Sequence, residues 1–129
     1  GSKVIVEDIY FNNVSDKIIS VGENSNINIR DIDGYNSFVG IACKDGSIVE
    51  ANNVNMKNVK IPFASYNKKF EYGKSKIFLS EINIANYKEE WLTDKNSKIF
   101  YKGNPVGVIS KKIIPIIYNK DLSLIKSFN

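Results

Sequence analysis

Residues 25–46 read SNINIRDIDGYNSFVGIACKDG, and residues 47–68 read SIVEANNVNMKNVKIPFASYNK. Both segments carry a serine, three apolar residues and an asparagine at the same offsets. The serine opens the same pattern at intervals of 22, 28 and 22 residues, at Ser25, Ser47, Ser75 and Ser97. A period of this length is the signature of a repeat architecture, in which each repeat is one structural unit that stacks on the next.

The apolar residues of each repeat alternate with polar residues over short stretches. They lie two, four and seven residues after the serine, as in Ile27, Ile29 and Ile32. Such alternation is typical of a strand with one buried face. The 20 Ile and 10 Val, against 4 Leu and 4 Ala, also favour strands. Three short strands in about 22 residues predict an all-β fold, a parallel β-helix (solenoid) of about five coils that stack about 4.8 Å apart.

An asparagine lies eleven residues after each of the serines at positions 2, 25, 47 and 75. These residues are Asn13, Asn36, Asn58 and Asn86. We expect them in the bend between the second and third strands of each coil. There each side-chain amide would donate a hydrogen bond to one neighbouring coil and accept one from the other. The sequence thus predicts a buried asparagine ladder.

The repeat and its asparagine row resemble the right-handed parallel β-helix of the pectate-lyase-like superfamily, over about residues 3–102. The segments 20–25 (SVGENS), 40–47 (GIACKDGS) and 66–73 (YNKKFEYG) are similar to segments of bacterial β-helix-repeat proteins, a family without a firm biochemical role. The resemblance implies right-handed coils. Pectate lyases bind calcium through clustered aspartates on one strand face, and this sequence has no such cluster. We therefore predict no metal site and no cofactor.

The two ends of the chain depart from the repeat. Pro105 and Pro115 interrupt the pattern, so we expect residues 103–129 to form an irregular last coil and a C-terminal cap. We interpret residues 1–2 as a cloning scar and the chain as a piece of a larger bacterial protein, extracellular or on the cell surface. No cap precedes Lys3, and uncapped coil ends predict self-association.

Composition excludes several functions. The chain has no His, which excludes His-based metal sites and Ser-His-Asp triads, and its one Cys excludes an internal disulfide. No apolar run approaches the roughly 18–20 residues of a membrane span. The formal net charge of +4 is too small to indicate nucleic-acid binding.

The third repeat carries an insertion of six residues within 66–74 (YNKKFEYGK). Aromatic faces stack on sugars, and lysines pair with anionic groups. We therefore predict that the insertion supplies ligand-binding residues, namely Tyr66, Lys68, Lys69 and Glu71. In the alternative interpretation, Phe70 or Tyr72 folds back over the coil and the lysines only keep the loop soluble. In either case we expect Asn67 to be a surface residue.

The loops on either side extend this predicted groove. The repeat places Glu23 above Asp45, and two carboxylates one coil apart would repel and raise one pKa. Such a pair could hold a cation or act as acid and base, whereas the alternative is a solvated turn at residues 44–47. The remaining candidates are Lys44 and the outward residues Glu50 and Phe78, over which we expect the insertion to lie.

Two main functions remain open from the sequence. The first is a non-catalytic binding or scaffold module that recognises a glycan or a surface protein. The second is a polysaccharide lyase or epimerase that acts on an anionic glycan through Lys68, Lys69, Tyr66 and the two stacked carboxylates. The lack of His and the single Arg favour the binding module. A purely structural spacer is a third interpretation.

Overall fold

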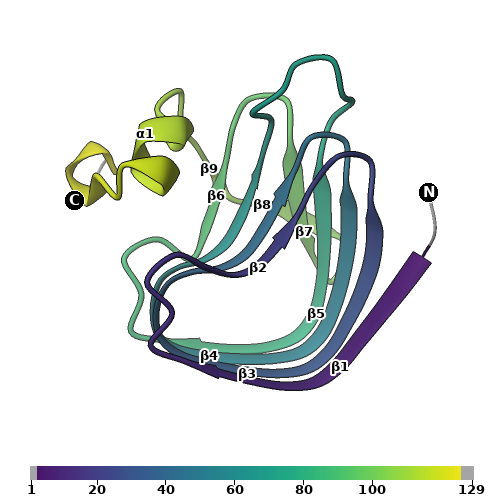
Figure 1. The fold of residues 1–129 in the computed structure, drawn as a ribbon, viewed down its shortest axis with the longest axis vertical. Helices are drawn as coiled ribbons and strands as arrows, with labels where there is room; N and C mark the ends of the chain where they lie inside the picture. The colour runs from purple at the N-terminus through teal and green to yellow at the C-terminus, as the bar shows by residue number, and fades with distance from the viewer. Residues whose placement is uncertain (1–2, 126–129) are drawn as a thin grey trace.

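The structure, a computed structural model, describes residues 3–125, which form a largely parallel nine-stranded sheet and one short helix (Figure 1). One path through the sheet runs in the order β1 (Lys3–Asn12), β3 (Asn26–Lys44), β4 (Ile48–Tyr66), β5 (Lys76–Ala85), β7 (Lys98–Tyr101) and β8 (Asn104–Val106). Beside this path, β2 (Lys17–Val21) pairs with β3, and β6 (Trp91–Thr93) pairs with β4 and with β9 (Val108–Ile109).

The register of the parallel strands reproduces the sequence repeat. Ile27 pairs with Val49, Val49 with Ile77, and Ile77 with Ile99. Each strand therefore pairs with the strand one repeat later, and equivalent side chains lie above one another. The predicted all-β class and the predicted alignment of the repeats are confirmed, and the arrangement is compatible with a β-helix-like fold.

Residues with positive φ mark the bends of the chain. The predicted asparagine row occupies one bend, with φ between 51° and 61° at Asn13, Asn36, Asn58 and Asn86. A second row, which the sequence analysis did not single out, has φ between 51° and 59° at Asp8, Asp31, Asn53 and Glu81. Asn and Asp adopt the left-handed conformation more readily than most residues. Both rows therefore suit the positions where the 19-residue strands β3 and β4 turn.

The asparagine ladder differs from the prediction in its burial and in two members, one of which is Asn86, because no hydrogen bond within residues 3–125 joins its side chain to Asn58. The Nδ2 atom of Asn58 donates to Oδ1 of Asn36, and Nδ2 of Asn36 donates to Oδ1 of Asn12, both at 3.0 Å. Asn12 thus replaces Asn13 in the ladder. All four predicted residues are exposed, so the expectation of a buried ladder is wrong. The left-handed residue breaks the alternation of strand faces at the bend, and its side chain lies in solvent.

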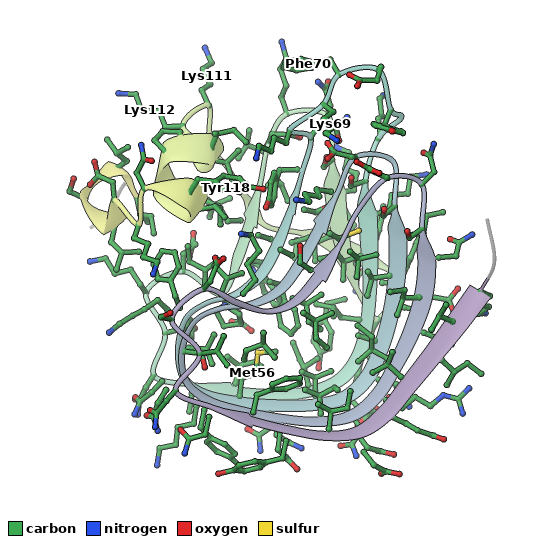
Figure 2. All side chains as sticks on the ribbon, in the orientation of Figure 1. Met56, Lys69, Phe70, Lys111, Lys112 and Tyr118 are labelled. Atoms are coloured by element: carbon green, nitrogen blue, oxygen red, sulfur yellow. The ribbon has the colours of Figure 1, made fainter. Side chains whose placement is uncertain are left out.

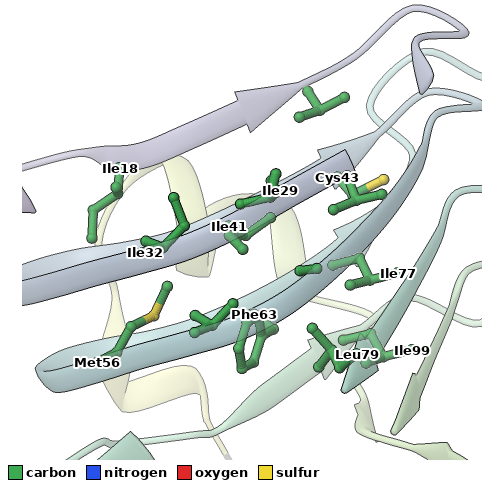
Figure 3. Close-up of a cluster of buried hydrophobic side chains, with 14 of the residues drawn as sticks. Ile18, Ile29, Ile32, Ile41, Cys43, Met56, Phe63, Ile77, Leu79 and Ile99 are labelled. Carbon is green, nitrogen blue, oxygen red and sulfur yellow. The ribbon is translucent and has the colours of Figure 1, made fainter. Parts of the chain in front are cut away.

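The core fills the inside of the winding (Figure 3). Cys43 is fully buried among branched side chains, as predicted, and burial raises the pKa of its thiol to about 12. A Cβ atom on Gly40 would lie 2.4 Å from the carbonyl oxygen of Pro62 and 2.6 Å from Sδ of Met56. Glycine is therefore required at position 40, because the backbone carbonyl of Pro62 leaves no room for a Cβ atom and Met56 fills the remaining space.

A short helix covers the outside of one wall of the sheet. The helix α1 (Ile113–Tyr118) and the 3-10 turn η1 (Leu122–Leu124) lie outside the winding (Figure 1). Ile113, Ile116 and Ile117 of α1 pack with apolar residues of the wall, namely Phe38, Val39, Ala42, Ile61, Ala64 and Leu92. None of the helices within residues 3–125 is long and apolar enough to cross a membrane.

This cover differs from the predicted cap. Residues 103–129 were expected to close the open end of the core, whereas α1 covers a side wall. The physical reason lies in the wall itself, because Ile61 faces the helix while its near neighbours Val59 and Phe63 face the core. A strand that is apolar on both faces needs a cover on its second face. Instead of a cap, β8 turns back antiparallel against β7, with Val106 packed on the core.

The exposure of the asparagine row makes a prediction about Asn58. Replacement of Asn58 by Ala should lower the free energy of unfolding by about 1–2 kcal/mol, because a Cβ-bearing residue without a polar side chain is strained at positive φ. Replacement by Gly should cost much less, since Gly adopts positive φ freely. Urea denaturation of the two variants measures the difference, and a cost for Gly equal to that for Ala would contradict a backbone origin.

The exposed strand β1 makes a prediction about self-association. Val4 is 49% exposed and Ile5 is 57% exposed, and β1 pairs on one side only among the described residues. We expect two copies of the 129-residue chain to pair antiparallel about Ile5, since Lys3 of one copy would then face Glu7 of the other.

Ile5→Glu should abolish this dimer in sedimentation velocity, because it places two like charges opposite each other. Phe70→Glu, which changes a side chain 84% exposed on a loop, is the matched control and should leave the dimer intact. A parent chain that stays monomeric at high concentration would refute the pairing.

Candidate anion-binding site

The insertion is held on the stack by a buried carboxylate. Oδ1 of Asp45 accepts hydrogen bonds from the backbone N–H groups of Lys68 and Lys69, both at 2.7 Å. Asp45 itself is only 1% exposed. The predicted acid–base role of Asp45 is therefore not supported by its position, because its carboxylate fixes the loop.

Asn67 is the second anchor of the insertion. Its Nδ2 donates to the carbonyl oxygen of Gly73 at 2.9 Å, and its Oδ1 accepts from the hydroxyls of Ser75 and Ser97 at 3.4 and 3.3 Å. Its backbone N–H donates to Oδ2 of Asp94 at 2.7 Å. The expectation that Asn67 is a surface residue is wrong, because the serine row lies inward and needs a polar partner.

Glu23 pairs with a lysine and not against a second carboxylate. Its Oε1 lies 2.5 Å from Nζ of Lys69. The hydrogen bond and the charge of Lys69 lower the pKa of Glu23, and the same contact raises the pKa of Lys69. The predicted repulsion between Glu23 and Asp45, with a raised pKa, is therefore wrong. Lys69 therefore has the largest influence on the pKa of Glu23, and Lys44 lowers it further.

Tyr66 lies beneath the surface. It is 0% exposed, and its hydroxyl lies 3.0 Å from the hydroxyl of Tyr118. Burial, together with the hydrogen bond to Tyr118, raises the pKa of Tyr66 far above its usual range. The prediction that the ring of Tyr66 stacks on a ligand is wrong, because the α1 cover encloses that ring.

Three lysines converge on Tyr118. The Nζ atoms of Lys68 and Lys17 lie 4.3 and 4.4 Å from the centroid of its ring, and Nζ of Lys44 lies 3.3 Å from its hydroxyl oxygen. Figure 2 shows Tyr118 directed from α1 toward the strands, while Lys111 and Lys112 point away. We call Lys17, Lys44, Lys68 and Tyr118 the lysine–tyrosine cluster.

The positive charge of this cluster is only partly neutralised. Nζ of Lys17 lies 3.1 Å from Oδ1 of Asp16. Within residues 3–125, no carboxylate lies within 4.0 Å of the ammonium group of Lys44 or Lys68. Two ammonium groups thus share one phenol without a carboxylate in direct contact, so the cluster can accept an anion. Each cation–π contact at an exposed site stabilises the arrangement by about 0.5–1 kcal/mol.

The other predicted residues occupy separate positions. Glu50 accepts a hydrogen bond from Asn28 at 3.3 Å, and Phe78 stacks on Phe100 with ring centroids 5.1 Å apart and planes at 10°. No hydrogen bond or ion pair within the described part of the chain joins Glu50 or Phe78 to the insertion. The prediction of one groove that combines them with the insertion is not supported, because these outward side chains lie on another wall.

The tip of the insertion is open to solvent. Phe70 is 84% exposed, Glu71 is exposed, and Tyr72 is half-buried. The alternative in which Phe70 folds back over the coil is therefore wrong. Of the nine predicted ligand residues, the structure brings Lys44 and Lys68 together at Tyr118, with Tyr66 buried beneath it. The sequence analysis missed Lys17 and Tyr118, and only the apolar run at residues 113–117 hinted that the tail would dock.

Comparisons of the chain with family models, with curated proteins and with solved structures find no match. Residues 3–125 contain no group of three or more Cys, Asp and Glu side chains placed to hold a metal ion.

The burial of Asn67 makes a prediction about the insertion. Asn67→Ala should lower the free energy of unfolding by about 1–3 kcal/mol, because it leaves buried hydroxyl and carbonyl groups without partners. Asn83→Ala is the control, since Asn83 is exposed on β5, and it should cost under about 0.5 kcal/mol. Urea denaturation compares the two variants, and equal midpoints would show that Asn67 does not anchor the loop.

Proposed function

We propose that the chain is a non-catalytic binding module that takes an acidic group of a glycan at the lysine–tyrosine cluster. The observation that carries this proposal is the convergence of three ammonium groups on Tyr118, two of them without a carboxylate partner among residues 3–125. Like charges gathered around one ring repel, and an anion bound beside their ammonium groups would relieve the repulsion.

The surroundings favour a glycan as the carrier of the anion. The insertion holds Lys68 in the cluster and places the exposed ring of Phe70 two residues further on. Aromatic rings have an apolar face on which sugar C–H groups can pack. Lysine acts as a point charge with three rotatable donors, which suits carboxylate or sulfate groups in varied orientations.

The lyase or epimerase alternative has less support. A general base has to be within hydrogen-bond reach of the proton that it removes and needs a pKa near the working pH. Glu23 is paired with Lys69, Asp45 accepts two backbone N–H groups, and the pKa of Tyr66 is shifted away from neutrality. Each of these groups already makes a contact that stabilises the structure, and this favours a binding module over an enzyme.

The finer fold assignment is part of the same proposal. We infer that the stacked strands are coils of a right-handed β-helix like that of the pectate-lyase-like superfamily. Support comes from the regular parallel register and from the right-handed crossover rule, which holds in about 98% of parallel connections. The bacterial origin, the extracellular or cell-surface location and a surface-protein partner are proposals that rest on the sequence resemblance alone.

A charge-matched pair of variants tests the proposed site. Lys44→Ala combined with Lys68→Ala should weaken binding of polygalacturonate at least about tenfold, which corresponds to about 1.4 kcal/mol. The control combines Lys57→Ala with Lys76→Ala, which removes the same charge from two exposed lysines outside the cluster. Calorimetric titration over a range of salt concentrations measures both double variants.

The lost affinity should be the salt-dependent part, because the cluster acts through charge screened over about 8 Å at physiological salt. If the Lys57/Lys76 double variant loses as much affinity as the Lys44/Lys68 double variant, the attraction depends only on the net charge of the chain, and the proposed site is refuted. Absence of binding to polygalacturonate and to dextran sulfate by the parent chain would refute the function itself.

A further inference from the structure

A groove follows the bend that carries the asparagine row. One part of it, of about 680 Å³, is lined by Asn13, Asn36 and Asn58. A second part, of about 540 Å³, is lined by Asn58 and Asn86, and both parts also share Lys60. The two shallow parts adjoin at Asn58 and Lys60, and we call them together the corner groove.

The asparagines leave regularly spaced polar atoms in this groove. In the ladder, Nδ2 of Asn58 gives one of its two hydrogens to Oδ1 of Asn36, and Nδ2 of Asn36 gives one to Oδ1 of Asn12. A side-chain amide has two donor hydrogens and an oxygen with two lone pairs. Since these side chains are exposed, their remaining donors and acceptors face solvent at the strand spacing of about 4.8 Å.

Three lysines line the same groove, and the carboxylates of Glu89 and Glu90 lie close to Tyr87 in its second part. Lys60 and Lys120 line its first part and Lys88 its second. Within residues 3–125, no carboxylate lies within 4.0 Å of the ammonium groups of these three lysines. Tyr87, 46% exposed, adds an aromatic ring to the second part. The groove therefore combines amides for hydroxyl groups, ammonium groups for anions, and a ring for an apolar sugar face.

We infer that the corner groove binds an extended acidic polysaccharide, which runs along the stack and crosses successive coils. A repeating row of amides fits a ligand that itself repeats hydroxyl groups along one direction, and the lysines fit its carboxylates. The inference goes beyond the proposed function, because it uses a different bend of the chain and none of the residues of the lysine–tyrosine cluster.

Glycine substitutions separate ligand binding from folding. Asn58→Gly removes the amide at the junction of the two parts but keeps the positive φ of 57° that the bend requires. Asn53→Gly is the matched control, because Asn53 has the same φ of 57° and the same kind of ladder hydrogen bond, to Asp31, at the other bend. Both variants should show the far-ultraviolet circular dichroism spectrum of the parent chain.

The binding measurement uses polygalacturonate as the probe. Asn58→Gly should weaken its binding about five- to tenfold, as expected for one or two lost hydrogen bonds, whereas Asn53→Gly should change it less than twofold. Lys60→Ala should reduce the salt dependence of binding. If Lys60→Ala weakens the binding of polygalacturonate and Asn58→Gly does not, the groove attracts the polymer by charge alone, as it would attract a nucleic acid. That result would overturn the inference.

The test also distinguishes the two sites. If Lys44→Ala with Lys68→Ala removes all binding while Asn58→Gly has no effect, the corner groove is refuted and the lysine–tyrosine cluster stands. If Asn58→Gly weakens binding and the lysine variant does not, the corner groove stands and the proposed function of the cluster falls. Equal effects of Asn58→Gly and Asn53→Gly would overturn the corner groove.

Discussion

The fold depends on residues that can bend the backbone at the same place in every repeat. A straight strand would carry the chain away from the stack. Residues that lie 22 positions apart can therefore pair in parallel strands only if the chain turns at the same position in every repeat. Asn36 and Asn58 provide one turn and Asp31 and Asn53 another, all with φ between 51° and 59°. The left-handed conformation costs most residues about 1–2 kcal/mol. Each coil therefore needs residue types that tolerate it, and the ladder hydrogen bonds at the bends follow from that placement.

The second constraint is a wall with two apolar faces. The wall covered by α1, which includes residues 37–44 and 59–66, buries side chains both toward the core and toward α1. Burial of apolar area stabilises the fold by roughly 25 cal/mol per Å², so the outer face favours a cover. The helix that provides this cover ends in Tyr118, whose ring then lies among the lysines of three successive segments of the wall. The position of the candidate site is thus a consequence of how the wall is covered.

Much of the fold could be predicted from the sequence, because it is encoded locally. The spacing of the serines predicted which strands pair, and the alternation of apolar and polar residues predicted which side chains point inward. Ile29, Ile77 and Cys43 are examples, and all three are buried. The site was less predictable. Asp45 and Asn67 look like ordinary turn residues. The role of Asp45 depends on backbone N–H groups of the insertion one coil away, and that of Asn67 depends on a carbonyl group within the insertion and on the buried serines. Tyr118 lies 74 residues from Lys44 along the chain, in a tail outside the repeat, so no spacing rule could have placed it.

The two polar surfaces differ in how rigidly their groups are held, and this difference bears on what each can bind. The ammonium groups of the lysine–tyrosine cluster sit on flexible side chains, but they are gathered by the ring and hydroxyl of one tyrosine, which is itself fixed by Tyr66. Such a site gains affinity mainly from charge and tolerates different anions. The amides of the corner groove sit on short side chains at bends whose backbone conformation is fixed by the fold. A short side chain on a fixed backbone loses little entropy on binding, so the asparagine row is better suited to selecting a ligand by its spacing than to attracting it from a distance.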